Sequence, residues 1–364
     1  MIAKNRRLQT AIDSLTELNV DALLVTSEIN VSYLSGFTGD SSYLLVTTDQ
    51  TTILSDGRFE TQIAIDCPEL SCAIRPPTQS MPELTGVALN QSGGKRVAIE
   101  SDQVSLATFR QLQADSDSIE FIETSGIVES ARMIKDQAEI DLTRQAVRIA
   151  EQAMQAILSS LRPDDTERAV AYRIEAEMRA RGAEGCSFPP IVAAGAGGAL
   201  PHYSPAETKI GDASSLLIDW GAFYQGYASD LTRTFHRPDA PTDYRDAYQA
   251  VLQAQLAAID LIAPGVAACD VDAAARRVLD QAGYGDAFLH SLGHGTGLEI
   301  HEGPRISGSS DQTLAAGMII TIEPGVYFQD RFGIRIEDDV LVTPSGCQVL
   351  SGLPKGLDDC GLIL

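Results

Sequence analysis

The sequence predicts an α/β N-terminal domain followed by an α+β C-terminal domain that is built from two related halves. Three observations support this fold class. The first third of the chain alternates short apolar runs with helical patterns, as layered α/β domains do. An amphipathic pattern from about residue 136 then predicts one long helix. Further on, a strand–acid–turn pattern occurs twice, at residues 216–230 and 319–337.

In the N-terminal domain, short apolar runs predict the strands of a partly parallel sheet. The expected strands are 21–26, 43–48, 51–55, 97–100 and 119–123, and the expected helices are 7–18, 58–66 and 104–114. This part of the chain contains no histidine and no evident cluster of acids. We therefore expect the chemistry to lie elsewhere, and we place the two domains at residues 1–130 and 131–364.

The C-terminal domain begins with the long helix. Its apolar stripe consists of Leu142, Ala146, Ile149, Ala153 and Ile157. A second helix is predicted after Pro163, with Asp164 or Asp165 as N-cap and Gly182 at its end. Two further helices are expected near 242–262 and 270–282, and strand-like runs lie between and after them.

The repeated pattern has the same order of residue types in both copies. An apolar strand leads to an acid, Asp219 or Glu323, which is followed by x-Gly and an aromatic residue. A second acid then follows, Asp230 in the first copy and Glu337 in the second. Two such hairpins that face each other would direct four carboxylates towards one point. The repeat suggests two structurally related halves.

Composition excludes several classes of partner. The net charge is −23, from 27 basic and 50 acidic residues. That balance argues against binding nucleic acid, which requires concentrated Lys and Arg, and against an anionic membrane surface. Six scattered cysteines form no CxxC pair, which favours a reducing compartment, although a disulfide between Cys67 and Cys72 stays open. The N-terminus has no signal-peptide pattern and no stretch is long enough to span a membrane, so we expect a cytoplasmic protein.

Four of the five histidines fall in two short segments, together with the most suggestive carboxylates. In order, these residues are His202, Asp219, Asp230, His290, His294, His301, Glu323 and Glu337. Asp, Glu and His together are ligands of Mn²⁺, Co²⁺, Fe²⁺ or Zn²⁺. The chain is therefore predicted to carry out metal-dependent hydrolysis. His236 lies outside this set, and we expect it at a surface or an interface without a role.

Four carboxylates and one imidazole form a nearly charge-balanced cage for two divalent ions. Two ions that share a water about 3.5–4 Å apart lower its pKa towards about 7, and the resulting hydroxide attacks a carbonyl. Other hydrolytic classes fit less well. The chain contains no Gly-x-Ser-x-Gly motif, and the glycine-rich stretches at 195–198 and 293–297 lack the Lys-Ser/Thr ending of a phosphate loop.

Several segments resemble one known family. They are Pro201–Tyr203, Ile218–Ala222, Ser229–Phe235, Gly293–Glu302, Thr321–Tyr327 and Gly333–Asp339. Their order and spacing resemble the pita-bread metallopeptidases, in particular the branch of Xaa-Pro aminopeptidases and prolidases. Asn30–Gly39 and Asp56–Phe59 resemble the creatinase-type N-terminal domain of that branch. The resemblance implies a creatinase-like domain followed by a pita-bread domain with pseudo-twofold halves.

The resemblance also implies two sets of site residues. Five would hold two divalent ions, first of all Mn²⁺, with Co²⁺, Zn²⁺ or Fe²⁺ as alternatives: Asp219, Asp230, His294, Glu323 and Glu337. In this set Asp230 and Glu337 would bridge the ions. Five residues would bind the substrate: His202, His290, His301, Tyr327 and Arg335. His202, His301 and Glu323 would act in catalysis, with Glu323 as the proton shuttle.

The activity implied first is that of an Xaa-Pro aminopeptidase, which removes the N-terminal residue before a proline. The alternatives are an Xaa-Pro dipeptidase (prolidase), a non-catalytic peptide-binding protein, and a creatinase-like amidinohydrolase without metals. The expected partners are peptides with proline at the second position and a second copy of the chain in a homodimer. Gly197 departs from the family pattern, which usually has Asn or Arg there. Arg335 has a structural alternative, a salt bridge to Glu337 or Asp338, and Trp220 is expected in the core.

Overall fold

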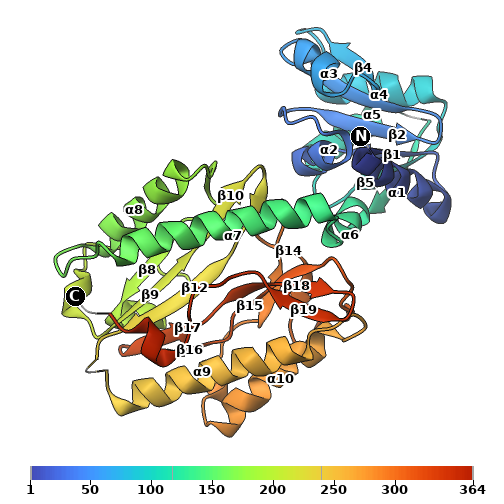
Figure 1. Ribbon diagram of the computed structural model, residues 1–364. Coiled ribbons are helices and arrows are strands. Elements are labelled where there is room, and N and C mark those ends of the chain that lie inside the picture. Colours follow the sequence, from blue (N-terminus) through green and yellow to red (C-terminus); the bar gives the residue numbers. More distant parts are fainter. Residues whose placement is uncertain (1, 117, 239, 363–364) are drawn as a thin grey trace. The chain divides into compact units, whose positions relative to one another are not determined.

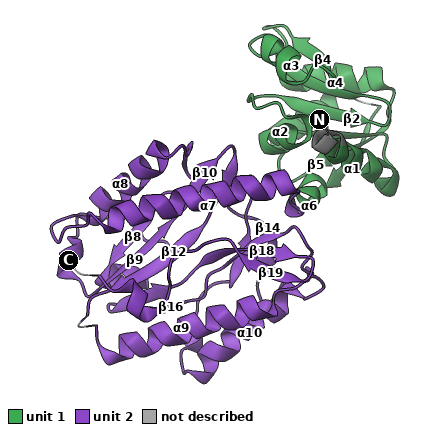
Figure 2. Cartoon of the chain, in the orientation of Figure 1, with its two compact units in different colours: residues 1–132 green, residues 133–364 purple. Residues whose placement is uncertain are grey.

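The structure is a computed structural model, which describes residues 2–116, 118–238 and 240–362, with side chains from residue 6 onward. It divides into two units, residues 1–132 and 133–364, each with its own hydrophobic core (Figure 2). In the described part of the chain, no helix has the length and apolar character needed to cross a membrane.

Unit 1 is an α/β domain around one six-stranded sheet in the order β4-β3-β2-β1-β5-β6. The strands are β1 (Ala22–Val25), β2 (Tyr43–Thr47), β3 (Thr51–Asp56), β4 (Ser71–Arg75), β5 (Arg96–Glu100) and β6 (Glu120–Thr124). The helices are α1 (Ile2–Leu18), α2 (Glu28–Ser35), α3 (Glu60–Asp66), α4 (Met81–Ser92), α5 (Leu106–Ala114) and α6 (Ile127–Met133). β1 pairs with β5, β5 with β6 and β3 with β4 in parallel, while β2 is antiparallel to both its neighbours. The partly parallel sheet is therefore confirmed.

Four elements of unit 1 were not predicted: strand β4 and helices α2, α4 and α6. Strand β4 is half exposed along most of its length, so it lacks the apolar run that marks the other strands. Helices α2 and α4 have clear end signals. The Ser27 side chain accepts from the Asn30 N–H in α2, and Ser80 and Glu83 form a capping box in α4. Both helices were missed because their apolar patterns are short.

Unit 2 begins with the expected long helix. Asp136 caps α7 (Gln137–Leu158) and forms a capping box with Glu139. The next helix, α8, covers Glu167–Ala180, and its N-cap is Thr166, whose side chain accepts from the Ala169 N–H. The prediction of Asp164 or Asp165 as the N-cap was therefore wrong. Later in the chain, α9 covers Thr242–Leu261 and α10 covers Ala268–Gln281.

The two halves of unit 2 repeat one arrangement of strands. The first half contains β8 (Ile191–Ala194), β9 (Ser215–Trp220) and β12 (Leu231–His236), with the hairpin β10 (Ala222–Tyr224) and β11 (Tyr227–Ala228) inserted before β12; β7 (Gly185–Cys186) joins β10. The second half contains β13 (Gly293–Gly295), β15 (Ile319–Ile322) and β18 (Asp338–Thr343), with the hairpin β16 (Gly325–Phe328) and β17 (Phe332–Arg335) inserted before β18; β14 (Glu302–Ile306) and β19 (Gly346–Val349) extend its edges. Each half follows a pair of helices. The predicted echo therefore corresponds to a structural repeat.

Helices cover these strands on both sides. In Figure 1, α7 crosses one face of the strands, and α9 and α10 lie together against the other. Among the described residues of the unit there are also four short 3-10 helices: η1 (Gly195–Ala199), η2 (Ile210–Asp212), η3 (Gly285–Ala287) and η4 (Leu357–Cys360). Trp220 is fully buried, and its indole N–H donates to the Ala150 carbonyl of α7 at 2.9 Å, as expected for a core residue.

A backbone bridge joins the two halves. The Glu337 N–H donates to the Thr232 carbonyl at 3.1 Å. The buried Arg233 guanidinium reinforces the bridge, because it donates to the carbonyls of Thr232 at 2.9 Å and Glu337 at 2.6 Å, and to the Asp338 carboxylate at 2.7 Å. The strands that carry the predicted site are thus held against each other.

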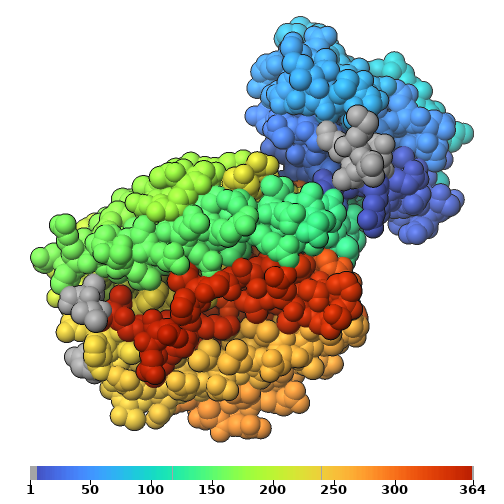
Figure 3. Space-filling view, viewed as in Figure 1, coloured from blue at the N-terminus to red at the C-terminus, as the bar shows by residue number. Residues whose placement is uncertain are grey.

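The C-terminal segment covers the surface between α7 and α9. Figure 3 shows this red segment between the green helix α7 and the yellow helix α9. Glu151 of α7 accepts from the Gly352 and Leu353 N–H groups, and the Tyr248 hydroxyl of α9 donates to the Lys355 carbonyl at 3.1 Å. These contacts fix the segment that follows β19.

The structure corrects the expectation for His236 and answers the open question of a disulfide between Cys67 and Cys72. His236 is only 4% exposed, and its two ring nitrogens lie 2.9 Å and 2.8 Å from the carbonyl oxygens of Arg237 and Leu357. It is a core residue and not a surface one. The Cys67 thiol donates to the Ser35 carbonyl at 3.2 Å, and no disulfide joins it to Cys72.

Candidate metal centre

The five residues expected to hold metal lie in the middle of unit 2, where regular strand pairing begins or ends. Asp219 is in β9, opposite Thr232. Asp230 immediately precedes β12, and His294 is the central residue of β13. Glu323 directly follows β15, and Glu337 lies between β17 and β18. Each half of the repeat therefore contributes one acid at its second strand, β9 or β15, and one just before its last, β12 or β18.

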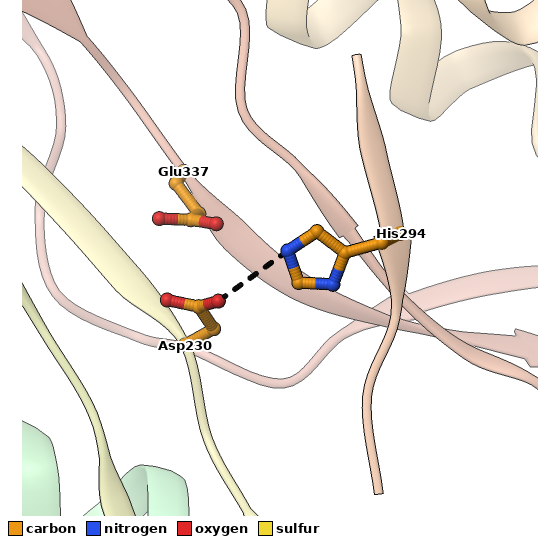
Figure 4. Close-up of side chains that lie close together, drawn as sticks. All are labelled: Asp230, His294 and Glu337. Atoms are coloured by element: carbon orange, nitrogen blue, oxygen red, sulfur yellow. Dashed lines mark ion pairs between the residues drawn. The ribbon is translucent and has the colours of Figure 1, made fainter. Parts of the chain in front are cut away.

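Three of these side chains converge closely. One ligand atom each from Asp230, His294 and Glu337 lie within 4.8 Å of one another, and Figure 4 shows the three groups facing a common point. His294 Nε2 is 3.6 Å from Asp230 Oδ2 and 3.5 Å from Glu323 Oε1. His294 Nδ1 lies 3.0 Å from the Gly295 carbonyl, which places the proton on Nδ1. The free lone pair of Nε2 thus faces the acids, as in a metal-binding histidine.

Asp219 is the fifth member, and its two oxygens differ. Oδ2 accepts from Arg335 Nη2 at 2.6 Å, whereas Oδ1 is buried and has no hydrogen-bond partner. A buried carboxylate oxygen without a partner is costly, so this atom is poised for a cation. The partner of Arg335 is therefore Asp219. Asp338, one of the alternatives, is paired with Arg233 and Lys355 instead.

The acids cannot all keep their charge in this setting without cations. Burial, and then repulsion by Glu337 and Asp219, raises the pKa of Asp230 well above its usual range. Burial raises the pKa of Glu323 to about 8, and burial with repulsion by Glu323 raises that of Glu337. Burial lowers the pKa of His294 to about 4, so its imidazole is neutral at pH 7. Three buried carboxylates, the partly buried carboxylate of Glu323 and a neutral imidazole fit two divalent cations.

His290, Tyr327 and Arg335 form one chain of hydrogen bonds beside this cluster. Arg335 Nη1 donates to the Tyr327 hydroxyl at 2.8 Å, and that hydroxyl lies 2.9 Å from His290 Nε2. His290 Nδ1 is 2.8 Å from the Ser291 carbonyl, which places the imidazole proton there. Tyr327 therefore donates to Nε2. Burial lowers the pKa of His290 to about 4, so the ring stays neutral and held in place.

The other two histidines are more exposed. The His301 ring lies 4.4 Å from the His294 ring, measured between centroids, so His301 stands next to the metal cluster. His202 also lies close enough to act on the acids. Burial raises the pKa of the Asp219 carboxyl, whereas Arg335, then Thr232 and then His202 lower it. All ten predicted site residues are thus placed in or beside one cluster.

Two supporting residues were missed by the sequence argument. The Thr232 hydroxyl donates to Glu337 Oε2 at 2.7 Å and accepts from Arg335 Nε at 3.1 Å. The Asp339 carboxylate accepts from the Asp230 N–H at 3.0 Å. A signal for Thr232 was present, because it stands two residues after Asp230 at the start of a strand and so shares its face. Asp339 gave no such signal.

The raised pKa values predict an unusual pH dependence for the metal-free protein. Unfolded Glu titrates near pH 4.3, whereas the pKa of folded Glu323 is about 8. Between these values the folded state binds more protons, so its stability falls as pH rises. We expect the melting temperature in excess chelator to be lower at about pH 8 than at about pH 5.5, and saturating Mn²⁺ to reverse that order. Thermal unfolding monitored by fluorescence measures both curves.

The matched control is Glu323→Gln, which removes one of the titrating carboxylates and should flatten the metal-free curve. A metal-free wild-type protein that becomes more stable from about pH 5.5 to about pH 8 would contradict mutual repulsion among the acids.

The carboxylates of the cluster need cations, and they lie where the two related halves of unit 2 meet. A metal-dependent hydrolase requires such a site. Residues 141–344 match metallopeptidase family M24, and residues 7–134 match the creatinase/prolidase N-terminal domain. The chain therefore belongs to metallopeptidase family M24 and is an enzyme of that class. The predicted combination of a creatinase-like domain and a pita-bread domain is confirmed.

Individual relatives agree with this placement over the whole chain. The Xaa-Pro dipeptidase of Pyrococcus horikoshii is 33% identical over 354 residues, which cover 97% of this chain and 99% of that protein. The structure of the Xaa-Pro dipeptidase from Bacillus anthracis matches with a TM-score of 0.93 and 33% identity, over 97% of this chain and 99% of that one. The structure of an X-Pro aminopeptidase from Thermotoga maritima matches with a TM-score of 0.86 and 33% identity, over 94% and 99%.

Proposed function

We propose that this enzyme is an Xaa-Pro dipeptidase, which hydrolyses the bond before proline in a dipeptide. The observation that carries the proposal is the convergence of Asp230, His294 and Glu337 within 4.8 Å, in a chain that aligns from end to end with proteins named Xaa-Pro dipeptidase. These names favour the dipeptidase alternative over the aminopeptidase reading preferred from the sequence. The X-Pro aminopeptidase relative keeps the second reading as a candidate.

The five-residue cluster is our proposed binding site for two divalent cations, with Mn²⁺ as the first choice. Asp219 would hold one ion, His294 and Glu323 the other, and Asp230 with Glu337 would bridge them. The orphaned Oδ1 of Asp219 and the free Nε2 of His294 support this assignment. When bound, such ions supply Lewis acidity towards the scissile carbonyl and acidify a water.

The side chains around the cluster would divide the remaining work. Glu323, whose Oε1 lies 3.5 Å from His294 Nε2, would hold and return a proton during the reaction. His202 and His301 would donate hydrogen bonds to the oxygen of the tetrahedral intermediate. In the resting enzyme His290 Nε2 already accepts from Tyr327, so His290 is better suited to shape the pocket than to donate.

Proline imposes its own requirement on the pocket. The bond before proline has no N–H, and the ring fixes φ near −65°. A site that recognises a peptide through the N–H of this bond would therefore fail to bind it. The pocket must instead recognise the shape of the proline ring. The side chains of Arg335, Tyr327 and His290, which hydrogen bonds fix in place, would form the surface that contacts the ring. We also propose, as expected from the sequence, that the enzyme forms a homodimer and is located in the cytoplasm.

The substrate panel that tests this function compares Ala-Pro, Ala-Pro-Ala, acetyl-Ala-Pro and Ala-Ala, with manganese-loaded enzyme. Ala-Pro should be cleaved fastest, because a dipeptide fills the pocket of a dipeptidase and its free C-terminal carboxylate binds there. Acetyl-Ala-Pro should be at least about 100-fold slower, because the site's polar groups lose the free amine. Ala-Ala should also be slow, because it lacks the ring. Chromatographic measurement of released proline or alanine gives kcat/KM for each peptide.

Two outcomes would count against the proposal. Faster cleavage of Ala-Pro-Ala than of Ala-Pro would favour the aminopeptidase candidate. Efficient cleavage of acetyl-Ala-Pro would contradict both candidates, because neither accepts a blocked amine.

A further inference from the structure

We propose that Glu167 is a positioning residue for catalysis, which holds the loop that carries His202 in its working conformation. The inference rests on the proposed function of His202 at the metal centre. Glu167 is the first residue of α8 and is fully buried. It belongs neither to the proposed metal ligands nor to the substrate set, so its burial calls for a separate explanation.

All three hydrogen bonds of the Glu167 carboxylate go to the His202 loop and its flanks. Oε1 accepts from the Ala194 N–H at 2.7 Å, where strand β8 ends and the loop begins. Oε2 accepts from the Tyr203 hydroxyl at 2.8 Å and from the Ala206 N–H at 3.0 Å. The carboxylate thus binds the loop at its start, beside His202, and at its end. Hydrogen bonds to a charged group are about twice as strong as neutral ones.

The backbone of the same turn of α8 reinforces this connection. The Glu167 N–H donates to the Thr208 carbonyl at 3.0 Å, and the Arg168 N–H donates to the Ala206 carbonyl at 3.1 Å. A helix N-terminus also favours a nearby negative charge. The start of α8 is therefore the part of the scaffold to which the loop is tied.

His202 itself lies between two such ties. The Pro201 carbonyl accepts from Arg335 Nη1 at 3.3 Å on the side of the metal centre. On the other side, the Tyr203 hydroxyl is fixed by Glu167. His202 is exposed, so surrounding side chains do not lock it in place as they do a core residue. The orientation of its imidazole must then be set by the residues on either side of it.

The Tyr203 ring also explains the glycine that departs from the family pattern. A Cβ on Gly197 would lie 3.1 Å from the Tyr203 ring, so the ring packs directly over this glycine. Tyr203 also packs against the small apolar cluster of Ile191, Ala193 and Leu217. A ring held by packing, with its hydroxyl bound by Glu167, fixes the backbone next to His202.

Glu167→Gln is the sharpest substitution because it keeps the size of the side chain. A carboxylate offers acceptors to all three donors, whereas an amide has one oxygen and one NH₂ group. In either orientation the NH₂ group faces a donor, either the Ala194 N–H or the pair formed by Tyr203 and Ala206. The matched control is Glu207→Gln, the same chemical change on the same loop. Glu207 is exposed and pairs only with Arg168, at 2.7 Å.

The first arm of the experiment measures kcat and KM for Ala-Pro with manganese-loaded enzyme. Glu167→Gln should lower kcat by roughly 10- to 100-fold at unchanged metal content, because a small misplacement of a catalytic group is costly. Tyr203→Phe, which removes one of the three donors, should change kcat in the same direction by less. Glu207→Gln should stay within about 2-fold of wild type, as surface changes usually do.

The second arm is a double-mutant cycle with His202→Ala. If Glu167 acts through His202, adding Glu167→Gln to His202→Ala should lower kcat by no more than about 3-fold further. A purely structural role would instead multiply the two losses. Multiplied losses in the double variant, or an unchanged kcat in Glu167→Gln, would overturn the proposal.

A third arm does not depend on the substrate. Hydrogen exchange of the amides at residues 194–208 should become faster in Glu167→Gln and stay as in wild type in Glu207→Gln. Unchanged exchange in Glu167→Gln would overturn the anchoring role. If the wild-type enzyme failed to cleave Ala-Pro, the proposed function would fail by itself, while this exchange measurement would still decide whether Glu167 holds the loop.

Discussion

Replacing Asp230 by alanine is expected to lower hydrolysis of Ala-Pro by at least about 1000-fold and to reduce bound metal at both positions of the cluster. The pKa of Asp230 is raised first by burial and then by repulsion from four neighbouring acids: Glu337, Asp219, Asp339 and Glu323. Its Oδ2 also lies 3.6 Å from His294 Nε2. A carboxylate at this central place can serve two cations, so its loss affects both.

Asp219→Ala is the matched control, because Asp219 stands at the edge of the cluster and shares one oxygen with Arg335. It should lower the occupancy of mainly one ion. Elemental analysis of both purified variants gives metal per chain. Thermal unfolding in excess chelator shows whether the fold persists, and Asp230→Ala should not be less stable there, because a repelled buried acid has been removed. Full metal occupancy in Asp230→Ala would contradict the bridging role.

The positions of the acids could be predicted from the sequence because they interrupt apolar strands. Asp219 and Glu323 come directly after residues that must be buried, so the burial of Asp219 and the partial burial of Glu323 followed from their neighbours. The second acid of each pair follows after a hairpin in both halves, which the repeat made visible. The pairing that brings the halves together is a long-range contact between Thr232 and Glu337, and no local pattern encodes it.

The wrong N-cap of α8 resulted from competition between equivalent local signals. Asp164, Asp165 and Thr166 are all good N-cap residues, and the backbone bond from Glu167 to Thr208 selects the last of them. His236 was assigned to the surface because it stands outside the motif blocks. Its burial results from Tyr244, Tyr248 and the Leu357 carbonyl, which come from α9 and the C-terminal segment. Glu167 was missed for the same reason, since its three partners lie 27 to 39 residues away.

Substrate preference was the least predictable property. An aminopeptidase and a dipeptidase differ in the contacts of the substrate's C-terminal end, and no motif in the sequence identifies these contacts. The proteins named Xaa-Pro dipeptidase match this chain over nearly its full length, and for this reason we propose a dipeptidase.

The second large effect is expected from removal of the metal. Four carboxylates gathered around one point cannot bind and polarise a neutral carbonyl without cations, because they repel one another and their pKa values rise. Enzyme dialysed against a strong chelator should therefore lose at least about 1000-fold in the rate of proline release from Ala-Pro. Recovery should require a divalent ion, and Mg²⁺ should be less effective than Mn²⁺, because His294 offers a nitrogen ligand that Mg²⁺ rarely takes.

The most direct test of the central claim is the rate of proline release from Ala-Pro as Mn²⁺ is added back to metal-stripped enzyme. We expect no measurable rate at the start and recovery that reaches its plateau near two ions per chain, the number that the five-residue cluster is proposed to hold. His294→Ala, measured beside it, should fail to recover at the same Mn²⁺ concentrations. Full activity of the wild-type enzyme in excess chelator would contradict the account.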